Sequence, residues 1–180
     1  MRKIILDLCG GTSAWSRPYA EAGYDVRIID TKYGLDVRTY KPPRNGHGIL
    51  AAPPCTHLAG SGARWWKEKG EGALLEALSI VDACLRIMIV AKPRFWALEN
   101  PVGRLSRYLG PPKTTFQPYE FGDPWTKRTC LWGDFNEPKR NPVDPVEGGK
   151  IWRMPPSPNR PEERSITPPG FARAFFEANR

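Results

Sequence analysis

This sequence lacks the marks of a membrane-spanning, disulfide-stabilised or zinc-binding protein. No apolar run reaches the roughly 18 residues that a membrane span needs. The four cysteines lie far apart and include no CxxC pair, which is unlike a zinc ribbon or a disulfide scaffold. From these two absences we expect no membrane partner, no metal site and a cytoplasmic location. Because the chain begins directly with a strand-like run, we also expect no signal peptide.

Proline, glycine and positive charge are plentiful instead. The 180 residues include 20 prolines and 17 glycines, which predicts long irregular segments. This length corresponds to a single domain, 1–180. The formal net charge of +8 favours an anionic partner such as nucleic acid or a phosphorylated small molecule, although solubility alone would also account for it.

Short apolar runs alternate with helical patterns in the first hundred residues. Leucine, valine and isoleucine recur at helical spacing over Ala73–Ala91. This alternation predicts an α/β fold, a mostly parallel Rossmann-like sheet with helices on both faces. The predicted strands of this part are Lys3–Leu8, Asp25–Asp30, Gly48–Ala52 and Phe95–Leu98.

The other segments carry weaker patterns. Strand-like stretches at Thr114–Phe121 and Thr129–Trp132 predict an antiparallel C-terminal hairpin, and the proline-rich segment 136–169 is expected to be irregular. The remaining predictions are a helix from an N-cap at Ser13 to Ala22, a weak third element at 34–37, a mobile loop at Gly60–Gly72 and a terminal helix at Phe171–Ala178.

A glycine turn follows the first predicted strand. The run Asp7-Leu8-Cys9-Gly10-Gly11 would let a ligand approach bare backbone, at the edge of the sheet where ligands of parallel sheets bind. Asp30 ends the second strand about 20 residues later, where an acid could bind ribose hydroxyls. Because the turn is not GxGxxG, a nucleoside-type cofactor is favoured over a dinucleotide.

A thiol and a carboxyl group follow two other strands at the same edge. Cys55 comes after Pro53-Pro54, whose fixed backbone makes a stiff loop, and Glu99 follows the strand that begins at Phe95. A thiol nucleophile beside a carboxyl group suits covalent catalysis with acid assistance. The alternative is a buried, unreactive cysteine, and His57 is a further candidate base.

In this order, these segments resemble motifs of the S-adenosylmethionine-dependent cytosine-C5 DNA methyltransferases. The matching stretches are Asp7-Leu8-Cys9-Gly10-Gly11, Ala52-Pro53-Pro54-Cys55 and Leu98-Glu99-Asn100-Pro101. The basic stretch at 119–129 and the stretch Ser165–Ala172 resemble two later motifs, so the likeness spans nearly the whole chain. The family usually has valine where Pro101 stands and glutamine where Trp125 stands.

The resemblance implies methyl transfer to C5 of cytosine in DNA, through a covalent cysteine adduct and with S-adenosylmethionine as cofactor. It implies Cys55 as the nucleophile, Glu99 as the partner of cytosine N3, and Arg128 or Lys127 near cytosine O2. It further implies base contacts by Pro54 and Asn100 and cofactor contacts by Asp7, Cys9, Gly10, Gly11, Asp30, Asp36 and Pro53.

The chain departs from this family mainly in size. Only about 30 residues, 136–164, stand where the family carries a sizeable target-recognition region, so we expect little sequence specificity. The compact size would fit a phage or mobile element. Three other interpretations stay open: C5 methylation of a free cytosine nucleotide, amino methylation, and a degenerate methyltransferase fold that only binds nucleic acid.

The loop after Cys55 combines basic and aromatic side chains. Arg64 and Trp65 lie within it, and such pairs suit phosphate contact and base stacking. We therefore expect this loop to contact the nucleic acid; a solvated loop whose tryptophans pack back on the core is the alternative.

Overall fold

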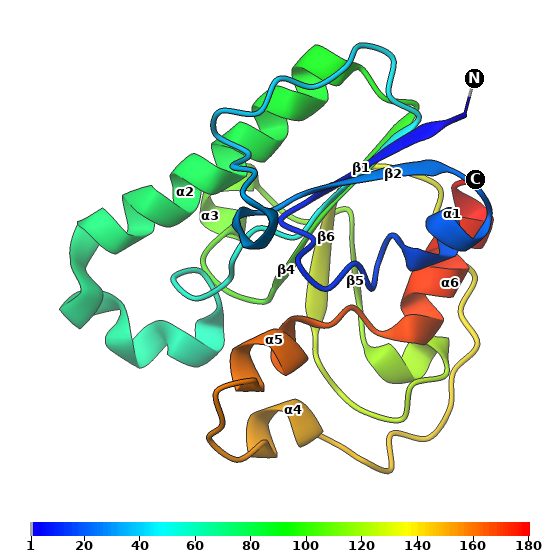
Figure 1. Ribbon diagram of the computed structural model, residues 1–180. Helices are drawn as coiled ribbons and strands as arrows, with labels where there is room; N and C mark the ends of the chain where they lie inside the picture. Colours follow the sequence, from blue (N-terminus) through cyan, green and yellow to red (C-terminus); the bar gives the residue numbers. More distant parts are fainter. Residues whose placement is uncertain (1) are drawn as a thin grey trace.

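One mixed β-sheet with helices on both faces organises the molecule (Figure 1). The computed structural model describes residues 2–180, and six strands of this part form the sheet in the order β2-β1-β3-β4-β6-β5. The mostly parallel α/β class predicted from the sequence is confirmed. The strands are β1 (Ile4–Leu8), β2 (Asp25–Ile29), β3 (Gly48–Ala51), β4 (Phe95–Pro101), β5 (Thr114–Phe116) and β6 (Thr129–Asp134).

Strand direction reverses only at β6 among the described strands. β1 runs parallel to β2 and β3, and β3 runs parallel to β4. β6 is antiparallel to both β4 and β5, which gives the predicted C-terminal hairpin. The predicted strand at Thr114–Phe121 is too long, because Pro118 has no backbone N–H to donate to a sheet and begins a 3-10 helix.

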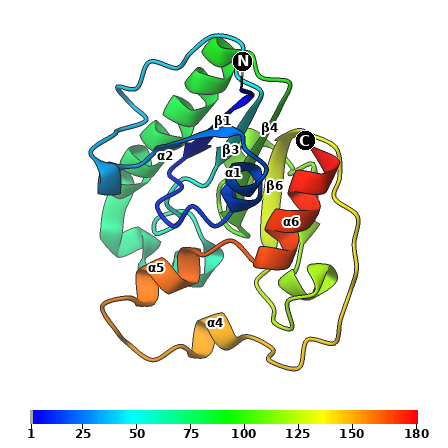
Figure 2. The same ribbon diagram turned by 45° about the vertical axis from the view of Figure 1, so that its right-hand side comes forward.

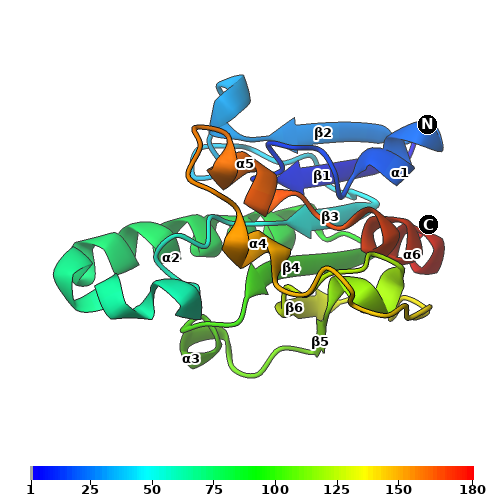
Figure 3. The same cartoon turned by 90° about the horizontal axis from the view of Figure 1, so that it is seen from below.

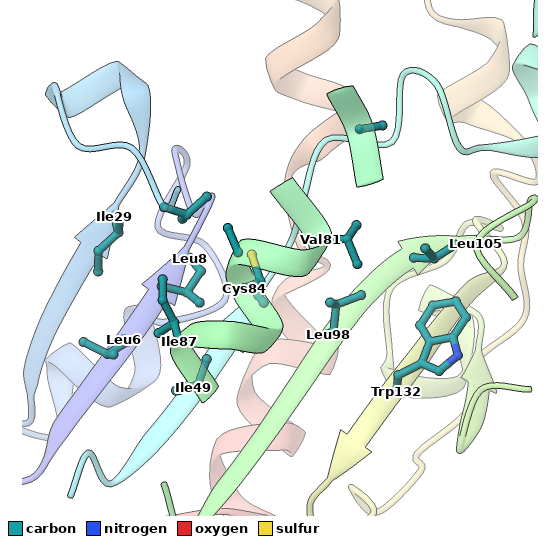
Figure 4. Packing of buried hydrophobic residues seen from close by; sticks show 14 of the residues in the cluster. Leu6, Leu8, Ile29, Ile49, Val81, Cys84, Ile87, Leu98, Leu105 and Trp132 are labelled. Carbon is teal, nitrogen blue, oxygen red and sulfur yellow. The ribbon is translucent and has the colours of Figure 1, made fainter. Parts of the chain in front are cut away.

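Helices cover the two faces of the sheet unequally. The long α2 packs on one face, where Leu6 and Leu8 lie beside its Ile87 and Leu98 lies beside its Val81 (Figure 4). α1 and α6 pack on the other face in an aromatic-rich cluster. The helices are α1 (Arg17–Glu21), α2 (Trp66–Ala91), α3 (Ser106–Leu109), α4 (Lys150–Arg153), α5 (Arg160–Ser165) and α6 (Pro169–Ala178), and the 3-10 helices are η1 (Thr31–Tyr33), η2 (Gly60–Trp65) and η3 (Pro118–Phe121).

Three predicted elements differ from the observed ones. Helix α1 starts later than expected, because Ser13 has a positive φ of 52° and cannot begin a helix; Ser16 is the N-cap residue. Segment 34–37 is a turn closed by Gly34, not a sheet element. The predicted loop at Gly60–Gly72 is η2 followed by the first turns of α2, and Gly70, with a φ of 72°, allows a kink there.

The proline-rich segment 136–169 contains the short helices α4 and α5 within otherwise irregular chain. Both helices lie beyond the end of the sheet, below the strands in Figures 1 and 2. None of the helices formed by residues 2–180 has the length and apolar character needed to cross a bilayer. Within the same residues, no three His, Cys, Asp or Glu side chains are grouped so that they could hold a metal ion.

Candidate active site

The carboxyl ends of four parallel strands lie at one edge of the sheet, which Figure 3 shows from below. β6 runs the other way, and its first residue, Thr129, pairs with Pro101 at the end of β4. The segment before β6 therefore reaches the same edge as the segments that follow β1 to β4. This topology brings Lys127 to Glu99 and Cys55.

The glycine turn after β1 rests on a buried carboxyl group. A Cβ atom on Gly10 would lie 2.1 Å from Oδ1 of Asp7, so only glycine fits above this side chain. The Ser16 hydroxyl donates to Oδ2 of Asp7 at 2.5 Å, and burial raises the pKa of Asp7 to about 6. Asp7 is 1% exposed, so it supports the turn from beneath rather than facing a ligand.

Cys9 contributes its backbone to the turn. Its φ is +58°, and its N–H donates to the carbonyl of Ile29 at 2.8 Å, which ties the turn to the end of β2. Its side chain packs on the α2 cluster, and a hydrogen bond with Cys9 raises the pKa of the Cys84 thiol. The thiol of Cys9 thus belongs to the packing between turn and helix.

Asp30 lies directly beside the glycine turn. A Cβ atom on Gly11 would come within 3.1 Å of Oδ2 of Asp30. Oδ1 accepts a hydrogen bond from the backbone N–H of Lys32 at 2.8 Å, which orients the carboxylate, and the Tyr33 hydroxyl donates to the carbonyl of Gly11. An acidic side chain therefore flanks exposed glycine backbone, as a ribose site requires.

Asp36 has a strong local partner. Arg38 binds its carboxylate at 2.6 Å and reaches Glu76 of α2 at 2.7 Å. Hydrogen bonds from Arg38 hold the pKa of Asp36 below its usual value. The Asp36 carboxylate, to which the family resemblance gives a cofactor contact, is thus engaged by Arg38.

A buried amide holds the Pro-Pro-Cys loop. Asn100 is fully buried, and its side-chain amide donates to the carbonyl of Pro53 at 2.9 Å across the gap between β4 and the loop. Pro53 is buried, whereas Pro54 is exposed and Cys55 is partly buried. Asn100 therefore positions the loop that carries the thiol.

The Cys55 thiol lies among charged groups of both signs. Burial and the negative charge of Glu99 raise the pKa of Cys55, while the positive charges of Lys127 and Arg164 lower it. The Nζ atom of Lys127 is 3.9 Å from Oε1 of Glu99. Burial raises the pKa of Glu99 and Lys127 opposes this rise, so the site holds a thiol, a carboxyl group and two cations.

Lys127 and Arg128, neighbours in sequence, lie in different surroundings. Lys127 is buried beside Glu99 and donates from Nζ to the carbonyl of Arg164 at 3.0 Å. Arg128 is exposed and lines a surface pocket of about 410 Å³ with Tyr119, Glu120 and Arg140. The basic group next to Glu99 is therefore Lys127, not Arg128.

Sequence reasoning missed the place of Arg164. Its charge lowers the pKa of Cys55, and its carbonyl accepts a hydrogen bond from Lys127. The signal that could have found it is its position directly before Ser165–Ala172, one of the stretches that resemble the family's motifs.

The loop after Cys55 presents one exposed aromatic–basic pair. The guanidinium of Arg64 lies 5.0 Å from the ring centre of Trp65, which is 46% exposed. Trp66, in contrast, is partly buried under Arg104, whose Nε donates to the carbonyl of His57. Arg64 and Trp65 thus face solvent, and Trp66 packs inward.

Comparisons with known proteins give limited matches. No family model and no curated protein match the sequence. Among solved structures, the chain is similar to a DNA modification methyltransferase encoded within a prophage (E. coli), with 16% identity and a TM-score of 0.43 over 86% of this chain and 49% of that one. It is also similar to DhpI in a complex with SAM and HEP, with 16% identity and a TM-score of 0.31 over 81% of this chain and 66% of that one. The chain spans about half the length of the first of these proteins.

Proposed function

We propose that this protein is an S-adenosylmethionine-dependent methyltransferase that methylates C5 of cytosine in DNA, with little sequence specificity. The observation that carries the proposal is the grouping of Cys55, Glu99 and Lys127 at one edge of the sheet, beside the glycine turn. A thiol alone would not suffice, since many cysteines are simply buried. A thiol whose neighbours are a buried carboxyl group and a lysine is equipped for covalent catalysis.

The residues at the ends of β1 and β2 fit the cofactor. Asp30 offers an oriented carboxylate for ribose hydroxyls, and the side-chain-free backbone of Gly10 and Gly11 allows close approach. The nucleoside part of S-adenosylmethionine has the hydroxyl and amino groups that such a site binds. When bound there, the cofactor supplies an electrophilic methyl group on a sulfonium centre.

Each catalytic residue then has one task. The Cys55 thiolate adds to C6 of cytosine, which moves electron density to C5. Glu99, as a carboxylic acid, donates a hydrogen bond to N3 and stabilises this electron-rich adduct. After methylation, C5 loses its proton to solvent and the Cys55–C6 bond breaks, which restores the aromatic ring and the Cys55 thiolate.

The proposed reaction needs Cys55 as a thiolate and Glu99 as a carboxylic acid, and Lys127 and Arg164 affect these protonation states. Both cations favour the Cys55 thiolate, which is the nucleophile. Burial raises the pKa of Glu99 against the effect of Lys127, which keeps the protonated carboxyl group accessible. Burial and Glu99 raise the pKa of Cys55 overall, and the two cations limit this rise, which makes the thiolate easier to form beside Glu99.

The test compares three substrates side by side. Tritiated methyl transfer from S-adenosylmethionine would be measured on duplex DNA, single-stranded DNA and dCMP, followed by nucleoside analysis of the product. We expect 5-methylcytosine in DNA. Methylation of dCMP alone would identify a nucleotide-modifying enzyme, an N-methylated base would identify an amino methyltransferase, and no transfer with intact DNA binding would identify a degenerate fold.

A further inference from the structure

A half-exposed tryptophan stands near the active site on the short helix α4. Trp152 is 48% exposed, and the guanidinium carbon of Arg164 lies 5.2 Å from its ring centre. The two residues come from different helices, α4 and α5, which flank one another below the sheet edge in Figures 1 and 2. A large aromatic surface is thus left open to solvent and backed by a cation.

The base of α4 is anchored to the segment that leads to Lys127. The backbone N–H of Thr126 donates to the carbonyl of Gly148 at 2.8 Å, and Trp125 forms a bridge with the same glycine. Lys150, at the start of α4, lies 3.6 Å from the ring centre of Trp125. Trp152 therefore sits on a supported helix rather than on free chain.

Arg164 connects this surface to the catalytic groups. Its side chain lies over Trp152, and its carbonyl accepts the hydrogen bond from Nζ of Lys127, which is 3.9 Å from Glu99. An exposed ring and the reacting thiol are thus linked through one arginine. A strand that delivers its cytosine to Cys55 would carry its neighbouring nucleotides close to this ring.

We infer that Trp152, backed by Arg164, stacks an unpaired base next to the target cytosine, and that the preferred substrate is single-stranded DNA. This inference rests on the proposed function. In a duplex, both faces of every base are covered by neighbouring pairs, so an exposed indole gains little there. In a single strand, any base can stack on the ring while the arginine meets the phosphate charge.

Stacking also agrees with the scarcity of base-reading surface. Every base has a flat face, so stacking tolerates all sequences, whereas specificity requires hydrogen bonds to base edges. Segment 136–164 offers two short helices and positive side chains in place of a recognition domain. The tryptophan would then supply affinity without sequence preference.

The experiment compares two substitutions of similar apolar character. Fluorescence anisotropy of a labelled cytosine-containing oligonucleotide, single-stranded or fully paired, would be measured with wild type, Trp152→Leu and Trp152→Phe. We expect Trp152→Leu to lower single-strand affinity about tenfold, Trp152→Phe to stay within about threefold of wild type, and duplex affinity to be unchanged. Val146→Ala, at an 82% exposed apolar position of the same segment, is the control and should bind as wild type does.

Several results would overturn the inference. Equal single-strand binding by Trp152→Leu and wild type would show that the ring does not stack, and equal losses on both substrates would show a general surface contact. Thermal melting of each variant separates these results from misfolding, and the Phe variant still reports on stacking if Leu does not fold. Because binding is read without turnover, Trp152-dependent binding in a protein that transfers no methyl group would remove the proposed function alone.

Discussion

The Nζ atom of Lys127 lies 3.9 Å from Oε1 of Glu99, and the two side chains are only 11% and 16% exposed. This lysine opposes the effect of burial on Glu99 and at the same time favours the thiolate of Cys55. One cation therefore acts on both groups that the proposed reaction needs. Since each group must be in a particular protonation state, we expect Lys127 to influence the pH range of the proposed activity.

Replacement of Lys127 should move the whole pH profile upward. Without the lysine charge in Lys127→Gln, the pKa values of Cys55 and Glu99 both rise, so both limbs of the pH profile shift to higher pH. The measurement is kcat/KM for methyl transfer against pH. Lys127→Arg should restore the profile, and exposed Lys139→Gln should leave it in place; an unmoved profile in Lys127→Gln would refute this role.

Loss of the Cys55 thiol should abolish methyl transfer. We expect Cys55→Ser to reduce turnover by about a thousandfold or more, with cofactor binding retained. A 5-fluorocytosine substrate should trap a covalent complex in wild type, because fluorine at C5 cannot leave as a proton does. Mass spectrometry would locate the adduct on Cys55. Cys130→Ala, a buried cysteine in β6, is the matched control, and full activity in Cys55→Ser would instead indicate amino methylation.

Asp30 should be required for cofactor binding. Removal of a hydrogen-bonding carboxylate in Asp30→Ala should weaken S-adenosylmethionine binding by about 10- to 100-fold in calorimetry. Asp25→Ala is the control, since this exposed acid begins the same strand and pairs with Arg27. Equal affinity in the Asp30 variant and wild type would place the nucleoside elsewhere.

Asp7 should make the fold less stable as pH rises. Burial raises its folded pKa to about 6 from 3.8, so the folded state holds the proton more tightly and loses stability as pH rises through about 6. Between pH 4.5 and 7.5, wild type should lose about 2 kcal/mol more unfolding free energy than Asp7→Asn. Urea unfolding at the two pH values measures this difference, and parallel changes in both proteins would contradict the prediction.

DNA contacts should be mainly electrostatic and should read little sequence. Affinity for DNA should fall steeply with salt, because lysine and arginine contacts displace counterions. Bisulfite sequencing of a methylated plasmid should show a context of at most two or three bases around the modified cytosines. Complete methylation of one longer motif, with other cytosines untouched, would contradict this prediction and reveal a sequence-specific recognition surface.

The strands of the sheet and the edge that carries the site could be predicted because their signals are local. Apolar runs ended by Gly10, Asp30 and Pro53 mark both a strand and its carboxyl end, whereas β4 continues past the predicted end at Leu98 to Pro101. The start of α1 could not be predicted, since a positive φ at Ser13 depends on the turn around it. The start of α2 was also predicted wrongly, but in the other direction. Gly70 is a helix breaker and predicts a loop, whereas the helix continues after this one kinked residue.

The choice between Lys127 and Arg128 lay beyond the sequence. Adjacent residues before a strand point to opposite sides, and which one meets Glu99 depends on the pairing of Pro101 with Thr129. The position of Arg164 depends on packing over an even longer range. Helix α5 must return to the sheet edge before the carbonyl of Arg164 can accept a hydrogen bond from Lys127. The motif resemblance supplied both Lys127 and Arg128 as candidates, and the pairing register of β4 with β6 determines that Lys127 meets Glu99.

The helix α5 is tied to the edge of the sheet at two separate points. Glu162 pairs with Lys32, next to Asp30, at 2.6 Å, and the carbonyl of Arg164 binds Lys127, next to Cys55 and Glu99. The proposed nucleoside site and the proposed cytosine site thus both border α5. In the proposed reaction, a movement that lifts α5 would break both contacts together, which would couple exchange of the spent cofactor to departure of the methylated strand.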